Sequence, residues 1–176
     1  PKKKLYTGKA VIVPKYKTLL LAVFGIYFAF QIGLPLRHWF FKDDVLWTEE
    51  GHRLSWRMML RSKSGSLTVW IKNKPDGEKK RYNYSELLGP KQQGSVATKP
   101  DVMWQLAQKI KAVEAKKGRD VAVYIEASVR VNHGKYHPFT DPTVDLAAEP
   151  WHPFKHSEWI LPSPEDYNEK PKPNSN

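Results

Sequence analysis

Apolar side chains form one unbroken stretch near the start of the chain. It runs from Thr18 to Leu36 and reads TLLLAVFGIYFAFQIGLPL, without a formal charge. At a rise of about 1.5 Å per residue such a helix measures roughly 28 Å, close to the hydrocarbon thickness of a bilayer. A buried core helix that is this long, apolar on every face and flanked by lysines on one side and aromatic residues on the other would be unusual. A cleaved signal peptide is shorter and is followed by small residues. The pattern predicts a transmembrane helix over residues 18–36.

The residues on either side of this stretch predict its orientation. Six lysines and no acidic residue precede it, at positions 2, 3, 4, 9, 15 and 17, and Trp39, Phe40 and Phe41 follow it. By the positive-inside rule the lysines stay in the cytoplasm and the aromatic side chains lie at the opposite interface. We expect residues 1–17 to form a basic cytoplasmic flank and everything after residue 36 to be extracytoplasmic.

Small and polar residues near the end of the predicted span suggest that it has neighbours in the membrane. Gln31, Gly33 and Pro35 suit contact with other helices better than contact with lipid. The chain also begins without an initiator methionine. We expect a piece of a longer protein, whose upstream transmembrane helices pack against residues 18–36.

Beyond the span, apolar and polar residues alternate in short segments. Alternation over residues 54–61 and 67–72 predicts two strands that form a hairpin across a turn at 63–66, where Ser and Gly favour chain reversal. A second turn at 74–77 contains Pro, Asp and Gly and leads to a polar strand near residues 78–84. A longer alternation predicts a strand over 121–131, which turns back at His133 and Gly134 toward 135–139.

One segment of the exterior part has helical spacing instead. Pro100 begins it, Gly118 ends it, and its apolar stripe is Met103, Leu106, Ile110 and Val113. The fold class is therefore α+β: one transmembrane helix followed by a small extracytoplasmic domain of mostly antiparallel β-strands with one amphipathic helix. We expect this β-rich domain to cover residues 37–162, and residues 163–176, rich in Pro, Glu, Lys and Asn, to form a disordered tail.

Composition removes several classes of function. The chain has no cysteine, so disulfides and thiolate metal sites are excluded. Its net charge of +11 is concentrated in the basic flank, and the exterior domain mixes both signs, so we expect no nucleic-acid partner. The histidines at 133, 137, 152 and 156 fall in two pairs four residues apart, but the first pair straddles a turn and the second contains Pro153. Neither pair is therefore expected on a helix face, and we expect no metal site.

Two features near the predicted span have competing interpretations. Arg37 and His38 suit the binding of an anionic group from outside, or their side chains only extend to the interface. The Trp and Met residues of the stretch from 44 to 66 either pack the domain onto a membrane bundle or form its own core. We favour docking, because Met59 and Trp70 fall on the nominally solvent-facing side of their strands.

Three strings of the sequence resemble a known family. PLRHWFFKDDVLWTEEGHRLSWRMMLRSKSG, DPTVDLAAEPWHPF and WILP are similar to the carboxy-terminal part of the vitamin K-dependent γ-carboxylases, in particular bacterial members of the horizontally transferred transmembrane (HTTM) type. The resemblance covers most of residues 34–162. It implies a multi-span membrane protein with a β-rich exterior domain after its last helix, in agreement with the topology predicted above.

The resemblance also implies a chemistry for the parent protein. A reduced quinone of the vitamin K type is oxygenated to a strong base, which removes a γ-proton from a peptide glutamate before carbon dioxide adds. The family's catalytic lysine and histidine belong to upstream helices, so we expect this fragment alone to have no catalytic residue, to bind no quinone and to be inactive. The family's animal members use a disulfide that this chain lacks, and they differ from it around Arg37.

By the same resemblance, the substrate-binding residues are Arg37, His38, Trp56 and Arg57, which are expected to hold a glutamate-containing peptide. The domain would then dock on the membrane bundle and help to present the substrate for quinone-driven carboxylation. The alternative is a membrane-anchored binding module on an HTTM scaffold that has no catalytic activity.

Overall fold

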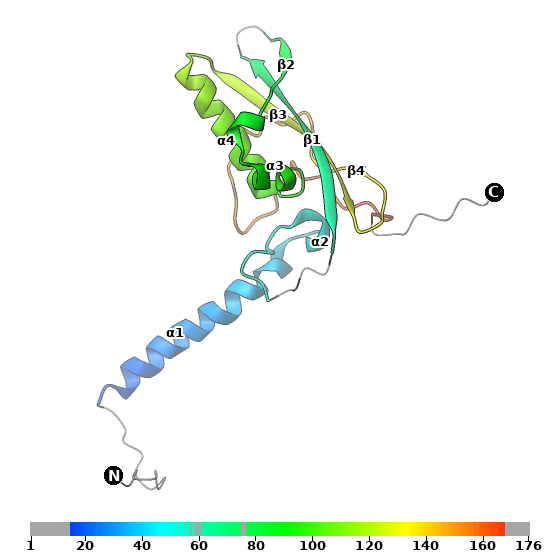
Figure 1. Ribbon diagram of the computed structural model, residues 1–176. Coiled ribbons are helices and arrows are strands. Elements are labelled where there is room, and N and C mark those ends of the chain that lie inside the picture. Colours follow the sequence, from blue (N-terminus) through cyan, green and yellow to red (C-terminus); the bar gives the residue numbers. More distant parts are fainter. Residues whose placement is uncertain (1–14, 57, 59–60, 75–76, 168–176) are drawn as a thin grey trace, which may run out of the picture.

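The computed structural model describes residues 15–56, 58, 61–74 and 77–167. Helix α1 (Lys17–Leu36) projects away from the rest of the molecule (Figure 1), and within it only Pro35 is buried. With the short helix η1 (Arg37–Phe40) it forms one apolar rod that is long enough to cross a membrane. Its exposed apolar surface is what a helix in lipid presents, because lipid tails do not penalise apolar side chains as water does.

The exterior part is built on a four-stranded antiparallel sheet with the strand order β2-β1-β3-β4. The strands are β1 (Lys63–Asn73), β2 (Lys79–Arg81), β3 (Val121–Val131) and β4 (His137–Pro138). Strands β1 and β3 pair along their whole length, from Lys63 opposite Val131 to Asn73 opposite Val121. The α+β fold class is thereby confirmed, and β3 begins and ends as its alternation predicts.

The start of the sheet differs from the prediction. Residues 63–66 do not form a turn but belong to β1 and pair with β3. Leu54 lies in a turn at a φ of 66° and Trp56 lies in a bend, so the strand predicted from residue 54 is wrong there. A Cβ on Gly65 would lie 2.8 Å from the carbonyl oxygen of Ser128, so this glycine permits close pairing of the strands. Pairing along an eleven-residue partner outweighed the local turn preference of Ser and Gly.

The second predicted turn is consistent with the structure. The N–H of Gly77 donates to the carbonyl of Asn73 at 3.1 Å, and β2 then pairs with the end of β1. Pro75 and Asp76 lie outside the described residues, as do Arg57, Met59 and Leu60.

Helices cover one face of the sheet. The predicted amphipathic helix is α4 (Pro100–Lys116), with Pro100 in its first turn and Gly118 just beyond it at a φ of 75°. Its buried residues pack with the odd-numbered residues of β3 in one core. Prediction missed α3 (Pro90–Val96), which precedes α4, and the short helices α2 (Val45–Thr48) and η2 (Ser85–Leu87).

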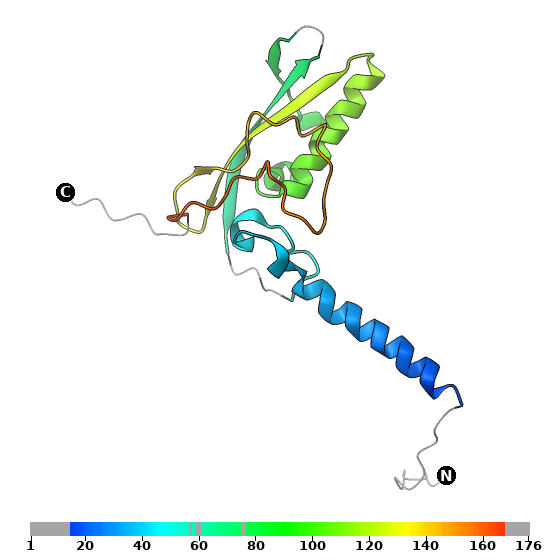
Figure 2. The same cartoon turned by 180° about the vertical axis from the view of Figure 1, so that it is seen from behind.

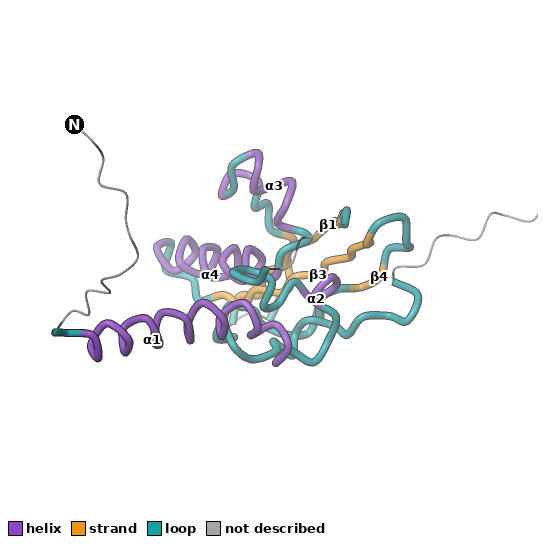
Figure 3. The backbone as a smooth tube through the Cα atoms, turned by 90° about the horizontal axis from the view of Figure 1, so that it is seen from below, coloured by secondary structure: helices purple, strands orange, loops and turns teal. Residues whose placement is uncertain are grey.

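The last part of the chain returns across the sheet toward α2 (Figure 2). The N–H groups of Phe139 and Leu146 donate to carbonyls of β3, and Thr140 pairs with Ile160. The Tyr167 ring lies 5.5 Å from that of Trp47 in α2, so contacts with the exterior part include a residue beyond 162. Loops surround the carboxyl end of α1, where they meet α2 (Figure 3).

Candidate functional site

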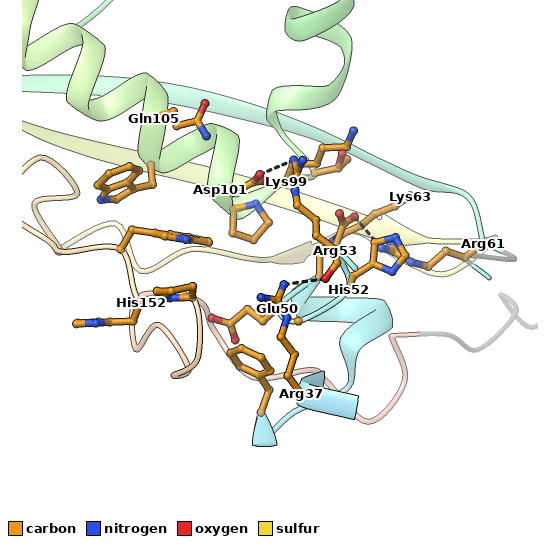
Figure 4. Close-up of a pocket in the computed structure, with 18 residues that line it drawn as sticks. Arg37, Glu50, His52, Arg53, Arg61, Lys63, Lys99, Asp101, Gln105 and His152 are labelled. Atoms are coloured by element: carbon orange, nitrogen blue, oxygen red, sulfur yellow. Dashed lines mark hydrogen bonds and ion pairs between the residues drawn. The ribbon is translucent and has the colours of Figure 1, made fainter. Parts of the chain in front are cut away.

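A cavity of about 680 Å³ lies where the end of α1 meets the exterior domain (Figure 4). Its wall comes from five parts of the chain: the residues after α1, the segment after α2, the start of β1, the start of α4 and the loop at 151–153. The lining residues are Arg37, Phe41, Glu49, Glu50, Gly51, His52, Arg53, Arg61, Lys63, Thr98, Lys99, Pro100, Asp101, Trp104, Gln105, Trp151, His152 and Pro153.

The turn after α2 presents two carboxylates to this cavity. Asp44 caps α2 by accepting from the N–H of Leu46, and Glu49 ends the helix at a φ of 59°. Gly51 follows at a φ of 67°, and a Cβ there would lie 2.7–2.8 Å from atoms of His38 and Phe41. Glycine therefore permits the tight turn that places Glu49 and Glu50 in the wall.

Glu49 is paired with the guanidinium of Arg61. One Nη atom of Arg61 lies 2.7 Å from Oε1 of Glu49, and the two side chains are 2% and 14% exposed. The Nε and the other Nη of Arg61 are buried without a hydrogen-bond partner in the part of the chain that the structure describes. Because such N–H groups lose their water without replacement, they favour an added acceptor.

Lys63 lies beside this pair at the first position of β1. Its side chain is 4% exposed, its Nζ donates to the carbonyl of Trp47, and the same Nζ is 4.0 Å from both Oε1 of Glu49 and the ring centroid of Phe139. Burial lowers the pKa of Lys63 to about 7, against the attraction of Glu49 and with help from the charge of Arg61. The amine is therefore neutral in a substantial fraction of molecules near pH 7.

Glu50 holds the wall together. Its Oε1 accepts from the N–H of Ser157 at 2.8 Å, and its Oε2 lies 2.5 Å from Nδ1 of His156. His156 therefore pairs with Glu50 in the wall of the cavity. Among the described residues, no group of three or more His, Cys, Asp or Glu side chains is arranged to hold a metal ion.

The structure brings one of the predicted substrate-binding residues into this cavity. Arg37 donates from an Nη atom to the carbonyl of Arg53 at 2.7 Å, lies 5.8 Å from the ring of Phe154, and has a buried Nε without a partner among the described residues. His38 donates from Nδ1 to the carbonyl of Pro35 at 2.8 Å and does not line the cavity.

The other two predicted site residues are placed differently. Trp56 is 72% exposed and is not part of the lining, and Arg57 lies outside the described residues. Sequence reasoning missed Arg61 and Lys63. Their spacing of two was a usable signal, because residues two apart in an extended segment point to the same side.

The lining has more cations than anions. It contains five Arg or Lys residues and three Asp or Glu residues, which with histidine neutral is an excess of two positive charges when Lys63 is protonated and of one when Lys63 is neutral. Arg53 and Asp101 form an ion pair, as do Arg61 and Glu49. This balance favours an anionic ligand.

The Trp and Met residues considered for docking divide into two groups. Trp47 is fully buried in the domain core, where its Nε1 donates to the carbonyl of Leu161 at 2.8 Å. Trp56 and Met58 are 72% and 76% exposed, and Trp39 and Phe40 in η1 are also exposed. The domain core therefore explains Trp47 but not the exposed side chains.

Comparison with known proteins agrees with this architecture. No curated protein and no solved structure matches the chain. A family model described as the vitamin K-dependent gamma-carboxylase lumenal domain matches residues 16–166, from the start of α1 to the end of the described exterior domain. Because this match covers most of the sequence, the chain belongs to the vitamin K-dependent gamma-carboxylase lumenal domain family.

Proposed function

We propose that this chain is the carboxy-terminal part of a γ-carboxylase-like membrane protein, and that the cavity of its exterior domain holds the carboxylate of an acidic substrate such as a peptide glutamate. The observation that carries this proposal is Arg37, whose Nε is buried and has no hydrogen-bond partner among the described residues, at a cavity with an excess of positive charge. A carboxylate satisfies such a donor with a charge-assisted hydrogen bond.

The position of Arg37 suits this role. It directly follows α1, so a ligand bound there lies where the helix would leave the bilayer. Low polarity around that position strengthens attraction between a guanidinium and a carboxylate relative to water. A substrate arriving from outside would be held beside reacting groups inside the membrane.

The exposed side chains of Trp56 and Met58 support docking on upstream membrane helices. Arg37 donates a hydrogen bond to the carbonyl of Arg53. This bond connects the end of α1 to the loop that leads to Trp56 and Met58. Apolar side chains near the membrane surface are more favourable when they pack against a bundle of membrane helices than when they are exposed to water. The proposed orientation places the exterior domain outside the cytoplasm.

The quinone implied by the family does not fit this cavity. Ten of the eighteen lining residues are Arg, Lys, His, Asp or Glu, and desolvating them against a hydrophobic quinone would be costly. The quinone is therefore not assigned to this cavity. Carboxylation belongs to the complete protein, and a parent without the catalytic lysine and histidine of the family would instead be a binding module.

The test is binding of a glutamate-containing peptide to the full-length protein in detergent. Arg37→Lys should weaken binding by at least about tenfold, because lysine cannot reproduce the planar fork of a guanidinium. Arg53→Lys is the matched control, since it changes a guanidinium on the same cavity but keeps the carbonyl that holds Arg37.

A peptide with glutamine in place of glutamate should bind weakly to every form of the protein. Equal affinity of the wild type and Arg37→Lys for the glutamate peptide would remove Arg37 from the site and leave it an interfacial cation.

A further inference from the structure

Lys63 is an unusual group for the wall of a cavity that would bind an anion. Its side chain is almost fully buried, and its Nζ faces the carbonyl of Trp47, the ring of Phe139 and the carboxylate of Glu49. Burial of this kind favours the neutral amine over the ammonium, and the pKa of Lys63 is lowered to about 7. A neutral amine is a nucleophile, which an exposed lysine at neutral pH is not.

The neighbouring guanidinium indicates what product this amine can form. Arg61 uses one Nη atom on Oε1 of Glu49, the same oxygen that lies 4.0 Å from Nζ of Lys63. Its Nε and other Nη are buried and have no partner among the described residues. A reaction that converts Lys63 into an anion would supply the missing acceptor, whereas a Schiff base would not.

We propose that Lys63 is a carbon dioxide site, which binds CO₂ reversibly as a lysine carbamate held by Arg61. The neutral amine attacks the carbon of CO₂, an N–C bond forms, and one C=O bond gives up its electron pair to become the carboxylate. One proton leaves the nitrogen for solvent through the cavity. Nothing is oxidised or reduced, and CO₂ is the only co-reactant.

The charge of the cavity supports this product. The lining carries an excess of two positive charges when Lys63 is counted as a cation. Conversion of Lys63 from cation to carbamate anion removes those two charges and makes the lining neutral. Glu49 opposes the new anion, and Arg61 lies against Glu49 and lowers that repulsion.

This site is separate from the proposed role of Arg37. It uses the start of β1 and needs no substrate carboxylate. Carbamate formation can therefore be tested independently of peptide binding. A negative result in either experiment leaves the other proposal unaffected.

The experiment uses the whole chain in detergent with ¹³C-labelled bicarbonate at equilibrium with CO₂. We expect a carbamate carbon signal in the ¹³C spectrum that increases as pH rises through about 7, where the amine loses its proton between the charges of Glu49 and Arg61. Trapping with an ethylating reagent, followed by peptide mapping, should place the ethyl carbamate on Lys63 of the folded wild type.

Variants complete the test. Lys63→Arg should abolish the signal, and Arg61→Gln should reduce it by several fold. Lys99→Arg changes another lysine of the same cavity and should leave it unchanged. If a variant does not fold, the wild-type peptide map decides. A trapped carbamate on other lysines only, or none at all, overturns the proposal.

Discussion

Replacement of Lys63 by methionine should stabilise the protein, and the gain should depend on pH. Lys63 is 4% exposed and lies against the Phe139 ring, where methionine fills a similar volume without a charge. In the unfolded chain the amine keeps its ordinary pKa of 10.5, whereas in the folded protein the pKa is about 7. Folding therefore expels a proton at any pH between these values.

The sign of the effect follows from proton binding. Between about pH 7 and 10.5 the unfolded chain binds one more proton than the folded protein, so the wild type becomes more stable as pH rises through this window. Below about pH 7 both states carry the proton, and the full penalty of burying it is present. At about 1.4 kcal/mol per pH unit, that penalty is on the order of 5 kcal/mol.

Methionine removes this penalty but also the hydrogen bond to Trp47, which contributes about 1 kcal/mol. The stabilisation by Lys63→Met should thus be largest at about pH 6 and smaller by roughly 3 kcal/mol at about pH 9. Denaturant unfolding in detergent, followed by tryptophan fluorescence in CO₂-free buffer, measures both values. Lys80→Met, on a side chain that is 68% exposed, is the control. A difference between wild type and Lys63→Met that is the same at both pH values would refute the reasoning.

Three further predictions concern other parts of the domain. Glu114→Gln should destabilise the chain by about 2 kcal/mol, measured by denaturant unfolding. Burial raises the pKa of Glu114, but hydrogen bonds from Lys117 and Arg119 outweigh this effect and hold the pKa below its ordinary value. The difference in stability from wild type should therefore fade as pH drops below about 4.5, and a difference that persists there would show that the carboxylate is not involved. Gly51→Ala should lower the free energy of unfolding by about 1–3 kcal/mol, because the new Cβ would sit on a residue with a left-handed φ and would contact Phe41. Gly94→Ala, in open space on α3, should not lower it, and equal effects of the two substitutions would contradict this argument. Trp56→Ser should leave the unfolding of this chain unchanged within about 0.5 kcal/mol but loosen the exterior domain in the full-length protein, seen as faster limited proteolysis; unchanged proteolysis would argue against docking.

Sequence patterns predicted the elements whose environment is uniform along their length. The uncharged run of α1, the stripe of α4 and the strict alternation of β3 each repeat a local preference many times, so no long-range information was needed to recognise them. The resemblance of SWRMMLRS and DPTVDL to the γ-carboxylases likewise depended on the sequence alone, and the family match over residues 16–166 agrees with it.

The start of β1 shows where local patterns fail. Residues 63–66 contain Ser and Gly and predict a turn, yet they pair with residues 128–131 of β3, which lie more than sixty positions further along the chain. A strand on its own gains little from extending through glycine. Only the hydrogen bonds offered by a distant partner make that extension favourable, and the sequence does not state which strand will be the partner.

The candidate site was decided mostly by tertiary structure. The order of the residues identified Arg37, because it follows an apolar helix, but it did not show that Arg61 and Lys63 would be buried against Glu49. Charged residues are usually exposed, so the sequence alone predicts that Arg61 and Lys63 face solvent. The pKa of Lys63 and the unpaired N–H groups of Arg61 among the described residues depend on which segments exclude water from these side chains. Around Lys63 those segments include α2 and the return of the chain at Phe139.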